Sequence, residues 1–341
     1  MGNEDVEGLT YILPIKASSP PTAELTLYLQ QLGAIPGIEL IVVDGSSPEM
    51  FEAHRRAFGA SVRHVAPDSD LATPMGKVGG VLTGVRLASH ERMIIADDDI
   101  RYDSTGLDSV SAQLLTVDVV RPQNHFDPLP FHALCDSGRI LLNRMSGGDW
   151  PGTLGVRRSA LRRTNGYDGS AMFENLELVR TVEASGGSEI VRPDIYVMRR
   201  PSTARHFWSQ RVRQAYDEIA RPARLAIQLA ILPLTVALTV RREGLAIGAL
   251  IVSIIAIAEA GRRRAGATRF FPFAASLLAP AWVAERAVCS WIAVGSRVFL
   301  GGVSYRGRIL RHAATPMRVL RKRFEENRLP LTEKAAQGRS A

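Results

Sequence analysis

The sequence predicts an α/β fold in which a mostly parallel sheet, flanked by helices, is followed by C-terminal membrane helices. The first observation is an alternation of short apolar runs with stretches of helical spacing in the front half of the chain. The second is a change of composition after about residue 220, where long apolar segments begin. Parallel strands follow from the alternation, because a parallel pair needs a crossover that is usually a helix.

Five short apolar runs are expected to form buried strands, at residues 9–15, 38–45, 61–66, 92–99 and 117–123. The stretches AELTLYLQQLGAI, PEMFEAHRRAFG and KVGGVLTGVRLAS between them carry the apolar spacing of helices. Ligands bind beyond the carboxyl ends of the strands in open sheets of this kind. Two of the strands end in acidic residues, at Asp44 and at 97–99, so we expect both acidic ends to face one crevice.

The composition excludes several classes of protein. A hydrophobic content of 46% with 22% charged residues is that of a folded chain. Two cysteines without CxxC spacing exclude a disulfide framework and a structural zinc site. Residues 1–200 carry 19 Lys and Arg against 26 Asp and Glu, whereas residues 201–341 carry 23 against 8. We expect the acidic front half and the basic back half to meet different surroundings.

Four regions are expected along the chain: a disordered N-terminus at 1–8, an α/β domain at 9–220, a membrane-associated helical region at 221–302 and a basic tail at 303–341. The N-terminus lacks the basic and apolar regions of a secretory signal, and cysteines are few. We therefore expect a multi-pass protein of the cell membrane whose α/β domain is cytoplasmic.

The apolar segments at 225–240 and 244–258 are close to the ~20 residues that span a bilayer. Arginines flank the pair, which favours a membrane hairpin over a helical hairpin buried in a soluble core. A third apolar segment, 270–302, contains Glu285 and Arg286 near its middle. Because charges are costly in lipid, we expect this segment to be interfacial or packed on protein rather than a further span.

The basic run YRGRILRHAATPMRVLRKRFEENR follows these segments. A basic stripe beside apolar helices is typical of a surface that binds the anionic headgroups of a membrane. Nucleic acid is the alternative partner, but the sequence has no nucleic-acid-reading motif, so we do not expect it.

Three adjacent carboxylates, Asp97, Asp98 and Asp99, follow the fourth apolar run. Like charges so close need a cation or many hydrogen bonds opposite them. Asp97 and Asp99 alternate along the backbone and can converge on one hard divalent cation, whose shell is often completed by phosphate oxygens. A turn or a helix cap is the alternative role. Lys77, in a glycine-rich helix entry, either meets a phosphate or a sugar or is a solvated surface lysine.

Six short motifs occur in order along residues 9–215: YILPIKA, IVVDGSSP, GKVGGVLTGVRLA, IIADDDI, FENLEL and SQRVRQ. With them the chain resembles a family 2 glycosyltransferase, which implies the nucleotide-sugar-binding fold called GT-A. The resemblance continues into the membrane segments. GGVSYRGR, at 301–308, is similar to the stretch after the last apolar segment in ceramide-glucosyltransferase-like and hopanoid-pathway members.

This resemblance implies roles for the acidic residues and the lysine. Asp44 would contact the nucleotide, commonly uridine, unless it only makes a turn. Asp97 and Asp99 would be the DxD pair that holds Mn²⁺ or Mg²⁺ against the diphosphate. Lys77 would lie near the donor.

SQRVRQ resembles the family's QxxRW signature, with Gln210 and Arg213 in place and Gln214 where tryptophan is usual. The resemblance implies that Gln210 and Arg213 take part in catalysis, with Arg213 assisting the departing diphosphate. It also implies that Arg211 contacts the donor. The alternative is that Arg211 and Arg213 are only basic residues close to the membrane.

FENLEL lies where the family has a glutamate–aspartate pair, whose aspartate usually serves as general base. Asn175 occupies that place here, and an amide cannot accept the proton. We therefore expect the adjacent Glu174 to be the base. Glu177, three residues later on the same helical face, is expected to be structural or to contact the acceptor.

Together these expectations describe a metal-dependent, inverting glycosyltransferase that moves a sugar from a nucleotide sugar, a UDP-sugar, to a lipid or lipid-linked acceptor. Residues 121–153 are expected to form an acceptor loop. One alternative is a processive polysaccharide synthase, which would need a channel lined by several helices. The other is a catalytically impaired, glycosyltransferase-like scaffold, which Asn175 favours.

Overall fold

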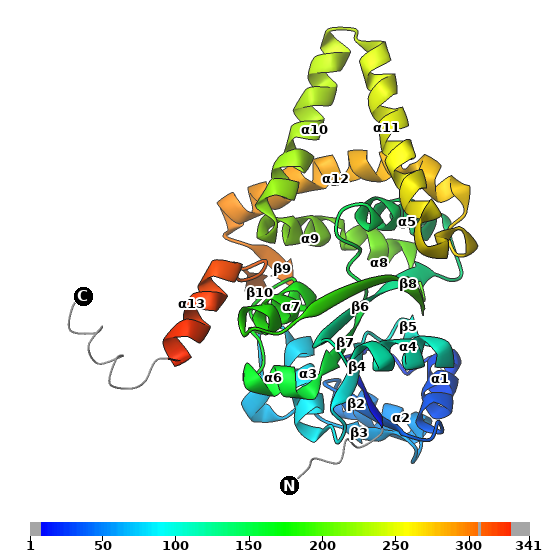
Figure 1. The fold of residues 1–341 in the computed structure, drawn as a ribbon, viewed down its shortest axis with the longest axis vertical. Helices are drawn as coiled ribbons and strands as arrows, with labels where there is room; N and C mark the ends of the chain where they lie inside the picture. Colours follow the sequence, from blue (N-terminus) through cyan, green and yellow to red (C-terminus); the bar gives the residue numbers. More distant parts are fainter. Residues whose placement is uncertain (1–7, 306–307, 329–341) are drawn as a thin grey trace, which may run out of the picture.

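The computed structural model of the protein describes residues 8–305 and 308–328. The expected N-terminal extension, apart from Gly8, and the end of the basic tail lie outside these residues. Figure 1 shows an α/β domain from which two long helices extend as a hairpin, with a third long helix across the hairpin base. The chain then returns to the α/β domain as a short β-hairpin and a helix.

Eight strands form one sheet in the order β3-β2-β1-β4-β7-β6-β8-β5. The four strands on one side are parallel: β1 (Leu9–Ile15), β2 (Ile38–Asp44), β3 (Arg63–Val65) and β4 (Arg92–Ala96). They coincide with the first four apolar runs of the sequence, although β4 ends before Asp97. Strands β1 and β4 are almost entirely buried, because helices cover both faces of the sheet.

The crossovers between these strands are α1 (Ala23–Gly33), α2 (Pro48–Phe58), the 3-10 turn η1 (Ser69–Leu71) and α3 (Gly76–Leu87). The hydroxyls of Thr22 and Ser47 cap α1 and α2 by accepting hydrogen bonds from backbone N–H groups of the first turn. The helical stretches expected from the sequence are therefore present.

The remaining strands are β5 (Ile100–Arg101), β6 (Val119–Phe126), β7 (Thr153–Arg157) and β8 (Glu189–Arg199). Strand β7 runs antiparallel between β4 and β6, whereas β6 and β8 are parallel. The helices of this half are α4 (Ser104–Gln113), α5 (Phe131–Arg144), α6 (Arg158–Arg163) and α7 (Glu174–Ala184). The sheet is thus mixed: β1 to β4 are parallel, and the second half of the domain adds one parallel pair and the antiparallel pairings of β7 and β5.

Residues 121–153 do not form the expected acceptor loop. Most of β6 and all of α5 lie within this segment. Helix α5 is not a surface loop because its apolar face, with Ala133, Ile140 and Leu141, is buried. Part of this face joins a core with residues of the C-terminal long helices.

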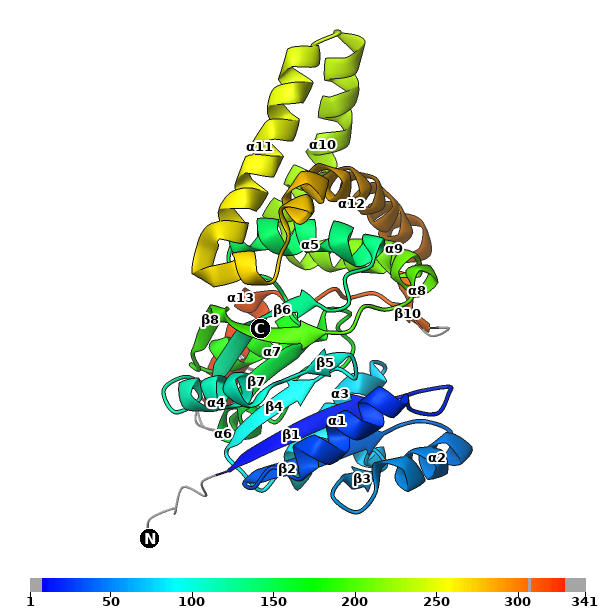
Figure 2. The same ribbon diagram turned by 90° about the vertical axis from the view of Figure 1, so that its right-hand side faces the viewer.

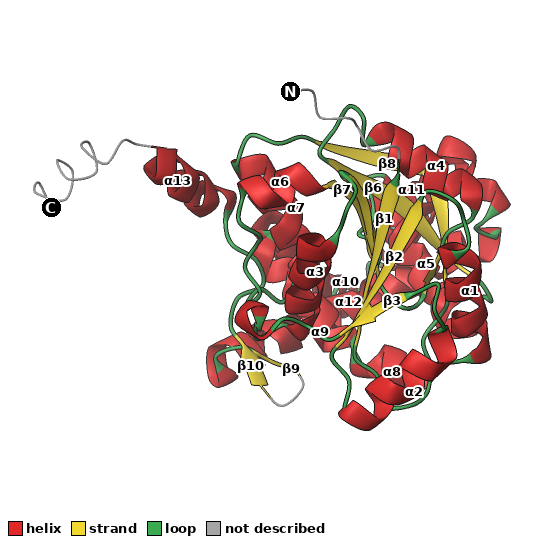
Figure 3. Cartoon of the chain, turned by 90° about the horizontal axis from the view of Figure 1, so that it is seen from below, coloured by secondary structure: helices red, strands yellow, loops and turns green. Residues whose placement is uncertain are grey.

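Two cores lie on opposite faces of the sheet, and Figure 3 shows the helices that cover them on either side. One core includes Leu29 of α1 and Phe58 of α2. The other includes Val81 of α3 and Leu178 of α7. Packing on both faces leaves the strand ends as the edge where polar groups can gather.

The chain leaves the α/β domain through α8 (Ala204–Ser209), α9 (Arg211–Tyr216) and the 3-10 turn η2 (Asp217–Ala220). The long helices follow: α10 (Pro222–Val240), α11 (Gly244–Arg263) with the 3-10 turn η3 (Arg264–Arg269), and α12 (Phe273–Leu300). Within the described residues, these three helical segments are long and apolar enough to cross a membrane. Only 6% of the apolar window of α10 and 11% of that of α11 with η3 are buried, against 33% for α12.

Helix α12 differs from the other two in its surroundings. Figure 2 shows α10 and α11 side by side, projecting away from the α/β domain, and α12 crossing at their base. Helix α12 packs against α5 and α9. Its Glu285 forms an ion pair with Arg211 at 2.5 Å, and its Arg286 is buried. The charges in the middle of this apolar segment therefore face protein.

The C-terminal strands β9 (Val303–Tyr305) and β10 (Arg308–Leu310) form an antiparallel hairpin, and α13 (Met317–Arg328) packs on α7. The backbone N–H groups of Met172 and Phe173 donate to the carbonyls of His312 and Ala313, both at 2.8 Å. The region expected as a basic tail thus begins with a segment that is built into the α/β domain.

Candidate active site

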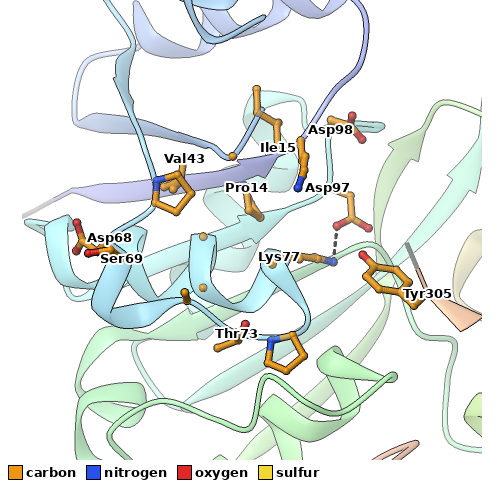
Figure 4. Close-up of a pocket in the computed structure, with 18 residues that line it drawn as sticks. Pro14, Ile15, Val43, Asp68, Ser69, Thr73, Lys77, Asp97, Asp98 and Tyr305 are labelled. Carbon is orange, nitrogen blue, oxygen red and sulfur yellow. Dashed lines mark ion pairs between the residues drawn. The ribbon is translucent and has the colours of Figure 1, made fainter. Parts of the chain in front are cut away.

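A cavity of about 600 Å³ opens at the carboxyl ends of β1, β2 and β4, where Asp97 lines it but Asp44, the other acidic strand end, does not. Figure 4 shows it between the strand ends and α3. One end is lined by residues 67–69, and the other by Lys77, Asp97 and Tyr305. The cavity is large enough for an extended small molecule.

Asp97 and Asp99 lie in the short connection between β4 and β5, which two backbone hydrogen bonds hold in place. The N–H of Asp97 donates to the carbonyl of Gly152 at 2.8 Å, and the N–H of Arg200 donates to the carbonyl of Asp99 at 2.7 Å. A β-carbon at position 152 would lie 2.7 Å from Oδ2 of Asp97, so a larger residue there would force the Asp97 carboxylate to shift. Asp97 is thereby fixed at the edge of this cavity, whereas Asp99 faces a second, smaller cavity.

Lys77 joins two residues that are far apart in the sequence. It lies in the first turn of α3, and its ammonium forms ion pairs with Asp97 and with Glu174, the latter at 2.7 Å. Burial acts against the charge of Lys77, but the carboxylates of Asp97 and Glu174 outweigh it and raise the pKa of the ammonium. Glu174, the expected base, and Asp97, an expected metal ligand, are therefore paired with the same lysine.

Arg199, at the end of β8, is a site residue that the sequence analysis missed. Its Nε donates to Asp99 at 2.8 Å, and its Nη2 lies 3.9 Å from Asp97. Burial disfavours the charge of this guanidinium, but Asp99 and Asp97 raise its pKa. No motif marks Arg199, because it reaches the site only through the pairing of β8 with β5.

Lys77 and Arg199 do not fully balance the negative charge of Asp97, Asp98 and Asp99. Burial, and then the charge of Asp97, raises the pKa of Asp98. Burial also raises the pKa of Asp99, helped by Asp97 and Asp98 and opposed by Arg199. Oδ1 of Asp99 is buried and has no hydrogen-bond partner among the described residues. Hard oxygen donors with this unbalanced charge fit a divalent cation such as Mg²⁺ or Mn²⁺.

Asp44 does not line the cavity, although its neighbours Val43 and Gly45 do. Its buried carboxylate contacts Nδ1 of His54 at 2.6 Å and Nε2 of His64 at 3.0 Å. Burial opposes its charge, but hydrogen bonds from His64, Ser46 and His54 lower the pKa of Asp44. This geometry does not support the expected contact with the nucleotide, because the carboxylate already has its partners.

Within the described residues, Asp44, His54 and His64 are also close enough together to hold a metal ion. Ligand atoms of Asp44, His54 and His64 lie within 4.8 Å of one another. The carboxylate is, however, in direct hydrogen-bond contact with both rings, which satisfies it without an ion. We interpret the group as a buried hydrogen-bonded triad that ties β2 to α2 and β3.

Gln210 and Arg213 line a second cavity of about 140 Å³, which Asp99 and Arg199 also line. Both residues therefore lie on the same cavity as Asp99. The guanidinium of Arg213 lies 5.3 Å from the centre of the Tyr305 ring. Oε1 of Gln210 and Nε of Arg213 are buried and without hydrogen-bond partners among the described residues.

Arg211 is placed differently from its neighbours. Its guanidinium is buried and forms ion pairs with Asp136 of α5 at 3.0 Å and with Glu285 of α12. It lines neither cavity. The expected donor contact of Arg211 is therefore not supported, and the residue instead joins α9 to α5 and α12.

The polar residues of the FENLEL segment have different roles: Glu174 lies at the site, whereas Asn175 and Glu177 make structural contacts. Nδ2 of Asn175 donates to the carbonyl of Pro151 at 3.1 Å. Glu177 is fully buried and accepts a hydrogen bond from the N–H of Thr315 at 2.5 Å. Glu174 is brought to Lys77, whereas Glu177 holds the C-terminal segment and is structural.

Asp217, in η2, is an additional titratable group near the site. Burial, reinforced by the negative charge of Glu174, raises its pKa to about 8, against the effect of Arg213 and Arg221. Its Oδ1 is buried and finds no hydrogen-bond partner among the described residues. The neutral carboxyl is therefore the form that the folded protein favours.

The replacement Asp217→Asn is expected to raise the thermal unfolding midpoint at pH 8 and to change it less at pH 5. The folded chain holds this proton with a pKa of about 8, whereas the ordinary value is 3.8. The stability from protonation is complete below about pH 4 and is lost as the pH rises to about 8. Asparagine resembles the neutral carboxyl and does not titrate. Asp108→Asn, at an exposed position of α4, is the control and should give the same small shift at both pH values.

No family model and no curated protein sequence matches the chain. Among solved structures, a mannosyltransferase from Pyrobaculum calidifontis, in complex with GDP-Man and Mn²⁺, is similar with a TM-score of 0.50. It is 19% identical, and the match covers 85% of this chain and 87% of that one. The chain has the GT-A fold. The predicted fold class is therefore confirmed.

Two further structures are similar at lower scores. Glucosyl-3-phosphoglycerate synthase from Mycobacterium tuberculosis, in complex with Mn²⁺, UDP and phosphoglyceric acid, has a TM-score of 0.42 at 14% identity and covers 59% of this chain and 74% of its own. TarS residues 1–349 from S. aureus, in complex with UDP-GlcNAc, has a TM-score of 0.43 at 15% identity, covering 59% and 61%.

Proposed function

We propose that the protein is a membrane-associated, inverting glycosyltransferase that moves a sugar from a nucleotide sugar to a lipid or lipid-linked acceptor. The observation that carries this proposal is the junction of Asp97, Lys77 and Glu174 at one end of the cavity. A pair of metal-binding carboxylates, a cation and a further carboxylate are the groups that such a transfer needs. The GT-A fold supports it, as does the resemblance to family 2 and to its ceramide-glucosyltransferase-like and hopanoid-pathway members. From that resemblance the donor is a UDP-sugar.

Asp97 and Asp99 would hold Mn²⁺ or Mg²⁺. When bound, the cation supplies positive charge that stabilises the diphosphate as a leaving group. Lys77 and Arg199, which now neutralise the two aspartates, are placed to turn to the phosphates of the donor. Arg213, in the adjoining cavity, would add positive charge on the same side, with Gln210 beside it.

Glu174 is the carboxylate that we propose as general base. Its partner Lys77 keeps it next to the cavity, and the amide of Asn175 is held by Pro151. Proton transfer from an acceptor hydroxyl to Glu174 requires that Lys77 be drawn to the donor, which frees the carboxylate. The catalytically impaired scaffold is disfavoured because a carboxylate remains at the site despite Asn175.

The membrane placement is also part of the proposal. Helices α10 and α11, exposed along their apolar length, would span the bilayer as a hairpin. Helix α12, packed on α5 and α9, would lie at the interface. On this topology the catalytic domain and the C-terminal segment are both cytoplasmic. The exposed arginines of α13 would face anionic headgroups.

A lipid acceptor is favoured over an extruded polymer. Of the three long apolar helices in the described part of the chain, one crosses the base of the other two. A hairpin alone does not enclose a channel for a polysaccharide. The acceptor would instead approach from the membrane surface, toward the cavity that Gln210 and Arg213 line.

The test is transfer of label from a panel of nucleotide sugars, including UDP- and GDP-sugars, by membranes from overexpressing cells supplied with lipid extract. We expect one donor to label the organic phase when Mn²⁺ or Mg²⁺ is present. Label confined to high-mass polymer would favour the polysaccharide synthase. Nucleotide-sugar binding without any transfer would favour the scaffold.

A further inference from the structure

The β9–β10 hairpin, which follows the last apolar helix, reaches the active-site cavity. Tyr305, the last residue of β9, lines the cavity together with Lys77 and Asp97. Figure 4 shows its side chain beside Asp97, on the side of the cavity away from Asp68 and Ser69. A residue 208 positions after Asp97 in the sequence thus forms the wall at the DxD end.

The hairpin is fixed to the catalytic domain by packing and by hydrogen bonds. Val303 and Leu310 are buried in a core that also contains Met75, next to the start of α3, and Met172, just before α7. The hydroxyl of Tyr216 donates to the carbonyl of Arg311 at 2.8 Å. Because these contacts are buried in the domain, the fold determines the position of Tyr305.

The ring of Tyr305 also contacts Arg213, a residue that lines the second cavity. The guanidinium of Arg213 lies 5.3 Å from the ring centre, within the range of a cation–π contact. Arg213 lines the smaller cavity and Tyr305 the larger one, so this pair stands between them. The reacting ends of donor and acceptor would meet at this boundary.

We propose that Tyr305 is a donor-binding residue that contacts the sugar and diphosphate end of the nucleotide sugar. This inference rests on the proposed function, in which Asp97 and Lys77 mark the diphosphate. The base and ribose would then occupy the end lined by residues 67–69, beyond the reach of Tyr305. A phenol offers an aromatic face for the apolar side of a sugar ring and a hydroxyl for its oxygens.

The test compares binding of UMP and UDP-glucose, with GMP and GDP-mannose in parallel, to the full-length protein in detergent with Mn²⁺. Tyr305→Ala is expected to weaken binding of the nucleotide sugar about tenfold and to leave the monophosphate unchanged. Tyr305→Phe, which keeps the ring, is expected to lose less. Ile309→Ala is the control, because Ile309 is 56% exposed on the same hairpin.

Wild-type affinity of Tyr305→Ala for the nucleotide sugar would overturn the inference and leave the proposed function standing. Equal weakening of monophosphate and nucleotide sugar, together with a lowered unfolding temperature, would also overturn it, since the hairpin would then be only a structural support. If the wild type binds none of the four nucleotides, both the proposed function and this inference fail.

Discussion

Asp99→Asn is expected to lower the rate of sugar transfer about a hundredfold or more, with the fold intact. The carboxylate of Asp99 lies at 2.8 Å from Arg199, next to Asp97, where the proposed metal is held. Asparagine keeps the shape of the side chain but removes the charge that binds a divalent cation. The measurement is initial rate of label transfer at saturating Mn²⁺, with the unfolding temperature of each variant as a check of folding.

The matched control for this variant is the middle aspartate of the triplet. Figure 4 shows the carboxylate of Asp98 directed away from Lys77, whereas Asp97 is paired with Lys77 and Asp99 with Arg199. Asp98→Asn should therefore reduce transfer much less than Asp99→Asn. Equal rates for the two variants would mean that the triplet acts only through its total charge and not through a defined metal pair.

Arg144→Ala is expected to cost about 3 kcal/mol or more of folding stability. Arg144, at the end of α5, is buried and joins the α/β domain to the end of the α10–α11 hairpin. Its guanidinium donates to the carbonyls of Gly261 at 2.9 Å and Arg264 at 2.6 Å, and also to Pro193 at 2.9 Å. Removing it leaves these carbonyls unsatisfied in a buried place.

The thermal unfolding midpoint in detergent measures this effect. Arg263→Ala is the control, because Arg263 lies in α11 close to Gly261, but its side chain is 74% exposed and its ion pair with Glu259 is at the surface. Arg144→Ala should lower the midpoint by several degrees, whereas Arg263→Ala should leave it nearly unchanged. Similar midpoints for both variants would show that the buried hydrogen bonds of Arg144 do not hold the two regions together.

Local sequence patterns were sufficient to predict the strands of the parallel half of the sheet and the surroundings of the third apolar segment. Strands β1, β2 and β4 are mainly apolar runs, and the acidic residues at 97–99 come directly after β4. The interruption of the third apolar segment by Glu285 and Arg286 correctly indicated contact with protein. The antiparallel direction of β7 could not be read in this way, because direction depends on where the chain returns.

The site depended on contacts between distant parts of the chain. Lys77 and Glu174 were each predicted, but their ion pair joins α3 to α7 across 97 positions. Arg199 carries no motif. Asp44 and Arg211 were expected to contact the donor, but the fold gives them other partners. Tyr305 lay within a stretch with family resemblance, GGVSYRGR, yet only the return of the chain after α12 brings it to the cavity.

The most direct test of the central claim is transfer of labelled sugar by the wild-type protein to the organic phase, measured with Mn²⁺ and after chelation. The account predicts label in a lipid product with one nucleotide sugar, its loss on chelation, and its recovery when Mn²⁺ or Mg²⁺ is restored. Lipid labelling that continues unchanged after complete removal of divalent cations would contradict it, because Asp97 and Asp99 would then have no metal to hold.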